Sequence, residues 1–240
     1  MSPRRFVPAG LAVLLLLIAL VMPVDAGLLN FPVQEEINVG REAAERFESS
    51  QHMMGGPQLA RIQRIGRKVA GATGRTDLPF TFKLVDNDAI NAITFPGGYV
   101  YVFRGLMECE PDDEELAGVL GHELVHATQS HAFKRLFMLR MLRRAQVKLT
   151  GQEQDNAATQ VLEVLSGSGL GRQLEYEADR IGVGFSNRAG YDPKGLLRVL
   201  EFFDKMEHSK PQLLERLVAS HPPARARIQK LQPVVERLER

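Results

Sequence analysis

The sequence predicts an α+β domain that is mainly helical and carries a small antiparallel sheet beside a central helix. Apolar residues recur at helical spacing over long stretches, whereas strand patterns are short: residues 80–85 alternate between apolar and polar, and a second strand, 99–103, follows Gly97 and Gly98. Composition agrees, because 44% hydrophobic and 25% charged residues in a chain of 240 are typical of one globular domain of ordinary size.

Helices are expected over 32–50 and 59–69, and from the acidic run at 111–115 to beyond Phe133. In the acidic run an Asp can cap the helix, and further carboxylates in the first turn favour the helix dipole. Three more helices are expected, from about Arg172, from about Asp192 and after Pro223.

The first residues have the pattern of a secretory signal. Two arginines precede an apolar run over 11–22, and small residues end at Ala26. We therefore expect an exported chain with a signal peptide at 1–26 and a single domain at 27–240. The alternative is an uncleaved anchor, because residues 6–24 approach the roughly 20 apolar residues that span a bilayer.

The charge balance limits the partners that composition can suggest. A formal net charge of +1 provides no general field for nucleic acid, so we expect no nucleic-acid partner. The basic, apolar-rich stretch 133–144 has three interpretations: a lid, a contact with a membrane surface, or a buried helix with solvated arginines.

His122 and His126 flank Glu123 in the sequence His-Glu-Leu-Val-His, inside one of the expected helices. A spacing of four places both imidazoles on one helix face, one turn apart, where they can hold one metal ion. Glu123 lies at the flank of that face, where it can hold a water as general base without ligating the metal. Gly118 either leaves space above the metal or serves helix packing.

A catalytic zinc site needs a third protein ligand and an open position for water. A histidine six residues after His126 would supply this ligand, but that position is Ala132. His131 points away from the ligand face and is interpreted as a surface or supporting residue. The favoured ligand is Glu175, with Asp179 one turn later placed to accept a hydrogen bond from the outer nitrogen of a ligating histidine. A solvated acidic helix face is the alternative for this pair.

Four ordered motifs support a family resemblance. They are His-Glu-x-x-His at 122–126, Glu-x-x-Ala-Asp at 175–179, Asn-Ala with Pro-Gly-Gly at 91–98, and Ser-His-Pro with a following arginine at 220–227. Together they resemble the zinc metalloendopeptidase family that includes the CAAX prenyl protease, the heat-shock protease HtpX and the periplasmic protease BepA. The last motif is similar to that of the exported branch.

The resemblance implies a zincin fold of the gluzincin type, with one Zn²⁺ per chain held by His122, His126 and Glu175. It implies peptide-bond hydrolysis by a zinc-activated water, with Glu123 as general base. It further implies a role in the bacterial periplasm, membrane-associated or free, on unfolded or misassembled envelope proteins, with an envelope-assembly partner.

Two further residues and one strand are candidates for substrate handling. His221 has three interpretations: a donor to the oxyanion, a plug on the open zinc position in a latent enzyme, or a helix-boundary residue with no catalytic duty. Arg227 is the other candidate for the oxyanion. An extended substrate is expected to pair with the edge of strand 99–103. The residues expected to contact it are Gly98, Tyr99, Val100 and Tyr101.

Two other classes of function use similar residues. The first is a metal-containing chaperone or binding module with little or no proteolysis, although structural zinc sites usually have four protein ligands and no use for Glu123. The second is a hydrolase of non-peptide amides, which shares the water-activating chemistry. Cleavage of an unfolded protein distinguishes a peptidase from both.

Overall fold

The computed structural model describes residues 32–150, 171–209, 211–214, 217–218 and 221–240, with side chains described as far as Met141 in the first range. The predicted signal peptide at 1–26 lies outside the described residues, so it stays a prediction. Within the described ranges, no helix combines the length and apolar character that a membrane crossing requires.

Helices dominate the fold, and the predicted α+β class is confirmed. The helices are α2 (Val33–Ser49), α3 (Pro57–Gly71), α4 (Arg104–Met107), α5 (Asp113–Thr128), α6 (His131–Thr150), α8 (Arg172–Arg188), α9 (Gly195–Ser209) and α11 (Ala224–Leu238), with a 3-10 turn η1 (Pro211–Leu214). The strands are β1 (Met53–Met54), β2 (Thr81–Val85), β3 (Ala92–Phe95) and β4 (Tyr99–Phe103). The sequence patterns predicted β2 and β4 but missed the shorter β1 and β3.

The sheet of the described residues is mixed, in the order β1-β2-β4-β3. Strands β2 and β4 are parallel, whereas β1 pairs with β2 and β3 with β4 in antiparallel fashion. The sequence predicted a purely antiparallel sheet, which is wrong because β2 and β4 are parallel. It also predicted a free edge at 99–103, which is wrong because β3 pairs with that strand. Strand β3 turns back through Gly97 and Gly98, both at positive φ, and covers that edge of β4.

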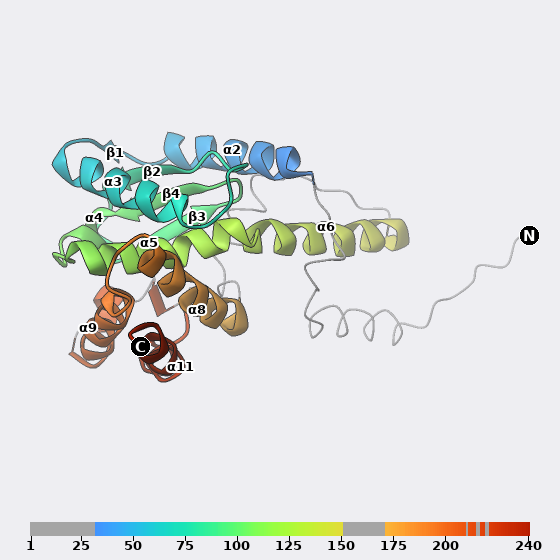
Figure 1. The fold of residues 1–240 in the computed structure, drawn as a ribbon. Helices are drawn as coiled ribbons and strands as arrows, with labels where there is room; N and C mark the ends of the chain where they lie inside the picture. The colour runs from blue at the N-terminus through green and yellow to red at the C-terminus, as the bar shows by residue number, and fades with distance from the viewer. Residues whose placement is uncertain (1–31, 151–170, 210, 215–216, 219–220) are drawn as a thin grey trace, which may run out of the picture.

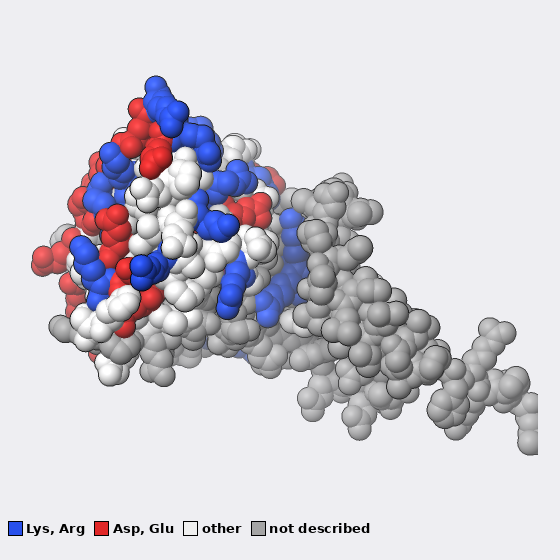
Figure 2. Space-filling model, turned by 90° about the horizontal axis from the view of Figure 1, so that it is seen from below, with Lys and Arg blue, Asp and Glu red and all other residues white. Residues whose placement is uncertain are grey.

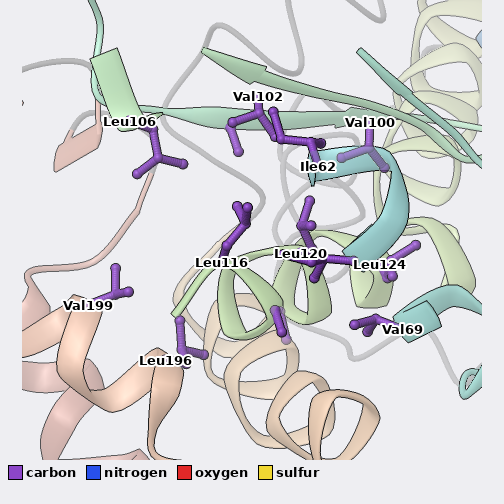
Figure 3. Packing of buried hydrophobic residues seen from close by; sticks show 14 of the residues in the cluster. Ile62, Val69, Val100, Val102, Leu106, Leu116, Leu120, Leu124, Leu196 and Val199 are labelled. Atoms are coloured by element: carbon purple, nitrogen blue, oxygen red, sulfur yellow. The ribbon is translucent and has the colours of Figure 1, made fainter. Parts of the chain in front are cut away.

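The two faces of the sheet are buried against different helices (Figure 1). Val100 and Val102 of β4 face the core formed with α3 and α5, whereas Tyr101 and Phe103 alternate to the opposite face and contact α2. Figure 3 shows the first of these cores, with side chains of α5 facing β4. Helix α5 thus lies directly under the sheet.

Helices α8, α9 and α11 pack on the side of α5 that faces away from the sheet (Figure 1). Seen from below, the molecule carries basic and acidic side chains interspersed around a neutral central strip (Figure 2). Covered on both sides, α5 is buried all round, which explains why its sequence is apolar without a distinct polar face.

Glycines allow the helices around α5 to approach very closely. A Cβ atom on Gly121 would lie 2.5 Å from the carbonyl oxygen of Gly182 in α8. A Cβ atom on Gly118 would lie 2.5 Å from the backbone nitrogen of Leu196 in α9. Gly118 therefore serves helix packing and does not open space above a metal.

Helix α5 begins as predicted and ends earlier than predicted. Asp112 and Glu115 form a reciprocal capping box at its start, with each side chain accepting from the other's backbone nitrogen, at 2.7 and 2.9 Å. The predicted continuation beyond Phe133 is wrong, because Ser130 adopts a φ of 55° and separates α5 from α6. The buried Glu36 of α2 accepts a hydrogen bond from the Ser130 hydroxyl at 2.7 Å and holds this break.

Helix α6 is anchored at its start and exposed farther along. Phe133 and Leu136 are buried against α2, whereas the side chains of Leu139 and Met141 are 39% and 49% exposed. The buried-helix interpretation of 133–144 therefore holds for the first turns. A lid or a membrane-surface contact by the rest of the stretch stays a prediction.

Replacing Gly182 with Ala is expected to separate α8 from α5, because the new Cβ atom would lie 2.7 Å from the backbone nitrogen of His122. Such overpacking costs about 1–3 kcal/mol of unfolding free energy. Gly184→Ala is the matched control on the same helix, since its Cβ atom would meet the flexible end of Arg188 at 3.4 Å. Denaturant unfolding measures both variants, and equal stabilities would contradict the importance of the contact.

Candidate metal centre

The two histidines of the His-Glu-x-x-His segment lie in the buried middle of α5. His122, Glu123 and His126 are 3%, 4% and 6% exposed. Polar side chains in such a position need partners, because an unpaired buried polar group is costly. Their partners come from α8, from β3, from the first residue of α6, from α11 and from the segment before α11.

Two imidazole nitrogens and one carboxylate converge between α5 and α8. The Nε2 atoms of His122 and His126 lie 3.1 Å apart, and the Glu175 carboxylate lies 3.5 Å from each of them. Zinc bonds of about 2.0–2.1 Å at tetrahedral angles place two ligand atoms about 3.3 Å apart. Two imidazoles and one carboxylate at these separations fit a zinc ion.

The protonation of Glu175 and His126 suits a cation between them. Burial by itself raises the pKa of Glu175, but the neighbouring His221, His122 and His126 outweigh it and hold the pKa well below its usual range. Burial lowers the pKa of His126 well below its usual value. At neutral pH the carboxylate is charged and His126 is neutral, which are the forms that bind zinc.

His122 is held from behind by Asp179 and Arg227. The Nδ1 atom of His122 lies 2.8 Å from Asp179, as the sequence predicted, and its Nε2 atom faces the centre. Burial and the charge of Arg227 lower the pKa of His122, but its hydrogen bonds to Asp179 and Glu175 outweigh them and raise it to about 9, so zinc binding would displace a proton from this ring. Arg227 donates two hydrogen bonds to the Asp179 carboxylate, at 2.9 and 2.6 Å. Burial by itself raises the pKa of Asp179, but Arg227 and then His122 lower the pKa by more than burial raises it. The carboxylate therefore stays ionised.

The hydrogen bonds between Arg227 and Asp179 bear on the role that the sequence predicted for Arg227. Both its Nε atom and one terminal nitrogen are hydrogen-bonded to the carboxylate, and the side chain is buried. The arrangement is that of a residue that positions His122 through Asp179. It favours positioning over the oxyanion role that the sequence suggested for Arg227.

His126 is held from behind by His131. The Nδ1 atoms of the two rings lie 3.0 Å apart, and Nε2 of His131 is 3.7 Å from the Glu177 carboxylate. Burial, followed by the charge of Lys134, lowers the pKa of His131 to about 4, so the ring is neutral at pH 7. When His131 carries its proton on Nε2, its Nδ1 atom can accept from Nδ1 of His126, which leaves Nε2 of His126 free for a metal. Of the two interpretations of His131, the surface one is wrong.

Glu123 is oriented by a residue that the sequence patterns did not identify. The hydroxyl of Thr94 in β3 donates a hydrogen bond of 2.7 Å to one carboxylate oxygen of Glu123, and both side chains are buried. Thr94 lies between the Asn-Ala and Pro-Gly-Gly motifs, in a strand of four residues that is too short to show clear alternation. The position of Thr94 between these two motifs is the one sequence signal that could have identified it.

His221 reaches the centre from the segment before α11. Its Nδ1 atom is hydrogen-bonded to Glu175, and its ring centroid lies 5.4 Å from that of His122. His122, Glu123 and His221 form a second group of donors, within 4.8 Å of one another, that shares His122 with the first. His221 is indeed at a helix boundary, but its side chain lies in the site.

The predicted substrate-strand residues lie away from the metal centre. Strand β4 has a partner on each side, so Tyr99, Val100 and Tyr101 have no free backbone edge for a peptide. Tyr101 faces α2, where its hydroxyl donates to Glu48 at 2.6 Å, and Gly98 lies in the turn beside Phe80. The edge strand beside the centre is β3.

Peptidase family M48 matches the chain over residues 57–235, which include the candidate metal ligands. This chain belongs to peptidase family M48. The family inferred from the four motifs is thereby confirmed, and with it the assignment to the peptidases.

Relatives with assigned names agree with this membership. The chain is 27% identical to the mitochondrial metalloendopeptidase OMA1 of Schizosaccharomyces pombe over 201 residues, which cover 80% of this chain and 56% of that protein. It is 28% identical to the beta-barrel assembly-enhancing protease of Escherichia coli over 228 residues, which cover 85% and 46%. The chain therefore spans about half the length of these relatives. The sequence motifs had indicated a resemblance to the beta-barrel assembly-enhancing protease, BepA, but not to OMA1.

Replacing His131 with Leu is expected to weaken zinc binding by about 10- to 100-fold, because His126 loses the acceptor that orients its ring. Competition with a zinc chelator measures the affinity directly. His208→Leu, at an exposed position on α9, is the control and should leave the affinity unchanged. An unaltered zinc affinity in the His131 variant would show that the contact with His126 does not support the site.

Proposed function

We propose that this chain is a zinc-dependent metalloendopeptidase with His122, His126 and Glu175 as zinc ligands and Glu123 as general base. The observation that carries the proposal is the convergence of two imidazole nitrogens and one carboxylate at tetrahedral separations, with a second carboxylate, that of Glu123, at their flank. Family membership supports the same chemistry.

His122, His126 and Glu175 would hold the zinc ion, which would supply the Lewis acidity that polarises a peptide carbonyl and lowers the pKa of a water toward about 7. Glu123 accepts the proton of the attacking water and delivers it to the leaving amine. Thr94 occupies one oxygen of Glu123 and so turns the other toward the reacting groups. Asp179 and His131 hold the two ligand rings in the tautomers that expose Nε2.

An extended peptide is proposed to pair with β3, in place of the edge of β4 that the sequence suggested. The side of β3 that faces away from β4 is unpaired among the strands that the structure describes. Thr94 of this strand contacts Glu123, so a peptide paired there would pass beside the general base. Main-chain hydrogen bonds select an extended conformation, which favours unfolded protein substrates.

We further propose that the substrates are unfolded or misassembled envelope proteins in the bacterial periplasm. The support is the N-terminal signal pattern together with similarity to proteases named for beta-barrel assembly. An envelope-assembly partner and association with a membrane surface belong to the same proposal. The exposed residues of α6 are the candidates for the membrane contact.

We propose that His221 keeps the enzyme latent until its segment moves. Its hydrogen bond to Glu175 and its place beside His122 and Glu123 support a plug over the open position of the zinc site. A donor to the oxyanion would instead need to leave the Glu175 carboxylate in order to face the substrate.

Replacing Glu123 with Gln is expected to abolish cleavage of an unfolded protein such as casein while zinc stays near one per chain. The amide keeps the size of the side chain and its contact with Thr94 but cannot accept the proton. A loss of about 10²- to 10⁴-fold matches the usual contribution of a general base. Elemental analysis and peptide release measure the two quantities.

Each other outcome has its own meaning. Zinc in both proteins with no cleavage by wild type would be the latent state, and the His221→Ala variant then decides: cleavage by that variant supports latency, and no cleavage by it favours the binding module or a hydrolase of other amides. A wild-type chain that binds no zinc would overturn the proposed function. Glu110→Gln, outside the site, is the matched carboxylate control.

Replacing His221 with Ala is expected to raise the rate of cleavage, because the zinc site loses its plug. A contact worth about 1.4 kcal/mol in the closed state corresponds to a tenfold rise in rate. The initial rate with a fluorogenic unfolded substrate measures the change, and His52→Ala at an exposed position is the control. A fall in rate at unchanged zinc content would favour the oxyanion role instead.

A further inference from the structure

The break between α5 and α6 is made by one residue, Ser130. Its backbone nitrogen donates to the carbonyl of Ala127 in α5 at 3.0 Å, and its own carbonyl accepts from the backbone nitrogen of Lys134 in α6 at 2.8 Å. The same residue therefore ends one helix and starts the next. Because His131 directly follows, the backbone conformation of Ser130 sets the position of the His131 ring against His126.

Ser130 adopts a conformation that serine does not favour. Its φ of 55° lies in the left-handed region, where the Cβ atom crowds the following carbonyl oxygen and glycine or asparagine is the more usual residue. A backbone held in such a conformation persists where contacts with the surrounding structure maintain it. A contact from outside α5 and α6 is therefore needed at this position.

That contact comes from the carboxylate of Glu36 in α2. One of its oxygens accepts from the Ser130 hydroxyl at 2.7 Å, and the other accepts from the backbone nitrogen of Gly97 at 3.4 Å. Glu36 is 3% exposed, and burial raises its pKa, although the hydrogen bonds and the charges of Arg75 and Lys134 act in the opposite direction. A buried carboxyl group is costly unless it is hydrogen-bonded, and here both oxygens have a donor.

Helix α2 keeps Glu36 in a fixed position. A Cβ atom on Gly40 would collide with the carbonyl oxygen of Pro96, so the backbone of α2 touches the turn between β3 and β4. Phe133 in the first turn of α6 is buried in the same cluster as Val39 of α2. Closely packed elements of this kind transmit a displacement to their neighbours. A shift of the Glu36 carboxylate would therefore be felt at the start of α6.

We propose that Glu36 is a positioning residue for the zinc site: through Ser130 it places His131, and His131 orients the ligand ring of His126. The proposal rests on the proposed function, because it assumes that His126 binds zinc. Glu36 lies in α2, before the residues 57–235 that match the peptidase family. A helix outside the matched segment thus contributes to metal affinity by way of two other residues.

Replacing Glu36 with Ala is expected to weaken zinc binding by about tenfold, the lower end of the range for residues that support a metal ligand. Competition with a zinc chelator measures the affinity of the chain. Tyr101→Phe is the matched control, because it removes a buried hydrogen bond of 2.6 Å between β4 and Glu48 of the same helix α2. It should leave the zinc affinity unchanged. An equal loss in both variants would show a general effect of loosening α2 and would overturn the proposal.

Ser130→Gly separates positioning from stability. Glycine adopts a positive φ without strain, so this variant should fold even where the loss of a buried carboxylate impairs folding. It lacks the hydroxyl that Glu36 holds, and we expect zinc affinity to fall by about the same factor as in Glu36→Ala. Denaturant unfolding of the zinc-free chain measures its stability alongside. Full zinc affinity in Ser130→Gly would contradict the proposed route through the hydroxyl.

The His131→Leu chain provides the test of the route itself. If Glu36 acts through His131, Glu36→Ala should weaken zinc binding little further once His131 is replaced, because residues that act in sequence are not additive. The same tenfold loss in both backgrounds would mean a merely structural role for Glu36 and would overturn the proposal.

Failure of the proposed function gives a different set of results. Zinc binding that depends on Glu36 as expected, without cleavage of any unfolded protein by wild type or His221→Ala, would reject the peptidase and keep the positioning role. Zinc binding and cleavage that are both unaffected by Glu36→Ala would reject the positioning role alone. A wild-type chain that binds no zinc would reject both.

Discussion

The metal centre depends on the contact between α5 and α8, where Gly121 and Gly182 let two helix backbones touch. The helices run antiparallel, so one turn forward on α5 corresponds to one turn back on α8. His122 therefore meets Asp179, and His126 meets Glu175, at side-chain separations that a larger residue at either glycine would increase. Gly182 follows Asp179 by three residues and Glu175 by seven, so one stripe of α8 carries the contact, the supporting carboxylate and the ligand.

Burial of this many polar groups is tolerated because each has a partner. Asp179 lies between His122 and the guanidinium of Arg227, and His131 lies between His126 and Glu177. The two ligand rings are thus supported from opposite sides by chemically different groups, one ionic and one neutral. Both supports have the same effect, since each holds its ring with Nε2 directed at the centre.

The reacting groups lie between two surfaces of opposite character. On one side is β3, whose backbone offers hydrogen bonds and whose Thr94 orients Glu123. On the other is α9, whose apolar side chains line a pocket that reaches Glu123. Helix α5 contacts both β3 and α9 and so fixes their relative position.

The sequence by itself determined what depends on near neighbours in the chain. The spacing of His122, Glu123 and His126, the pairing of Glu175 with Asp179, and the acidic start of α5 all follow from helix geometry, and each is found where it was predicted. These arrangements need no knowledge of distant segments. The amphipathic helices α2 and α3 were predictable for the same reason.

Only the tertiary structure decided arrangements that join residues far apart in the chain. Glu36, 94 positions earlier, accepts a hydrogen bond from the Ser130 hydroxyl at the break between α5 and α6, where the next residue, His131, contacts His126. Arg227 could be assigned to Asp179 only once α11 was placed. Strand β3 covers the edge of β4 although its four residues carry too little pattern to identify it. Periodicity reports which face a residue occupies, whereas the identity of its partner is set by packing between elements.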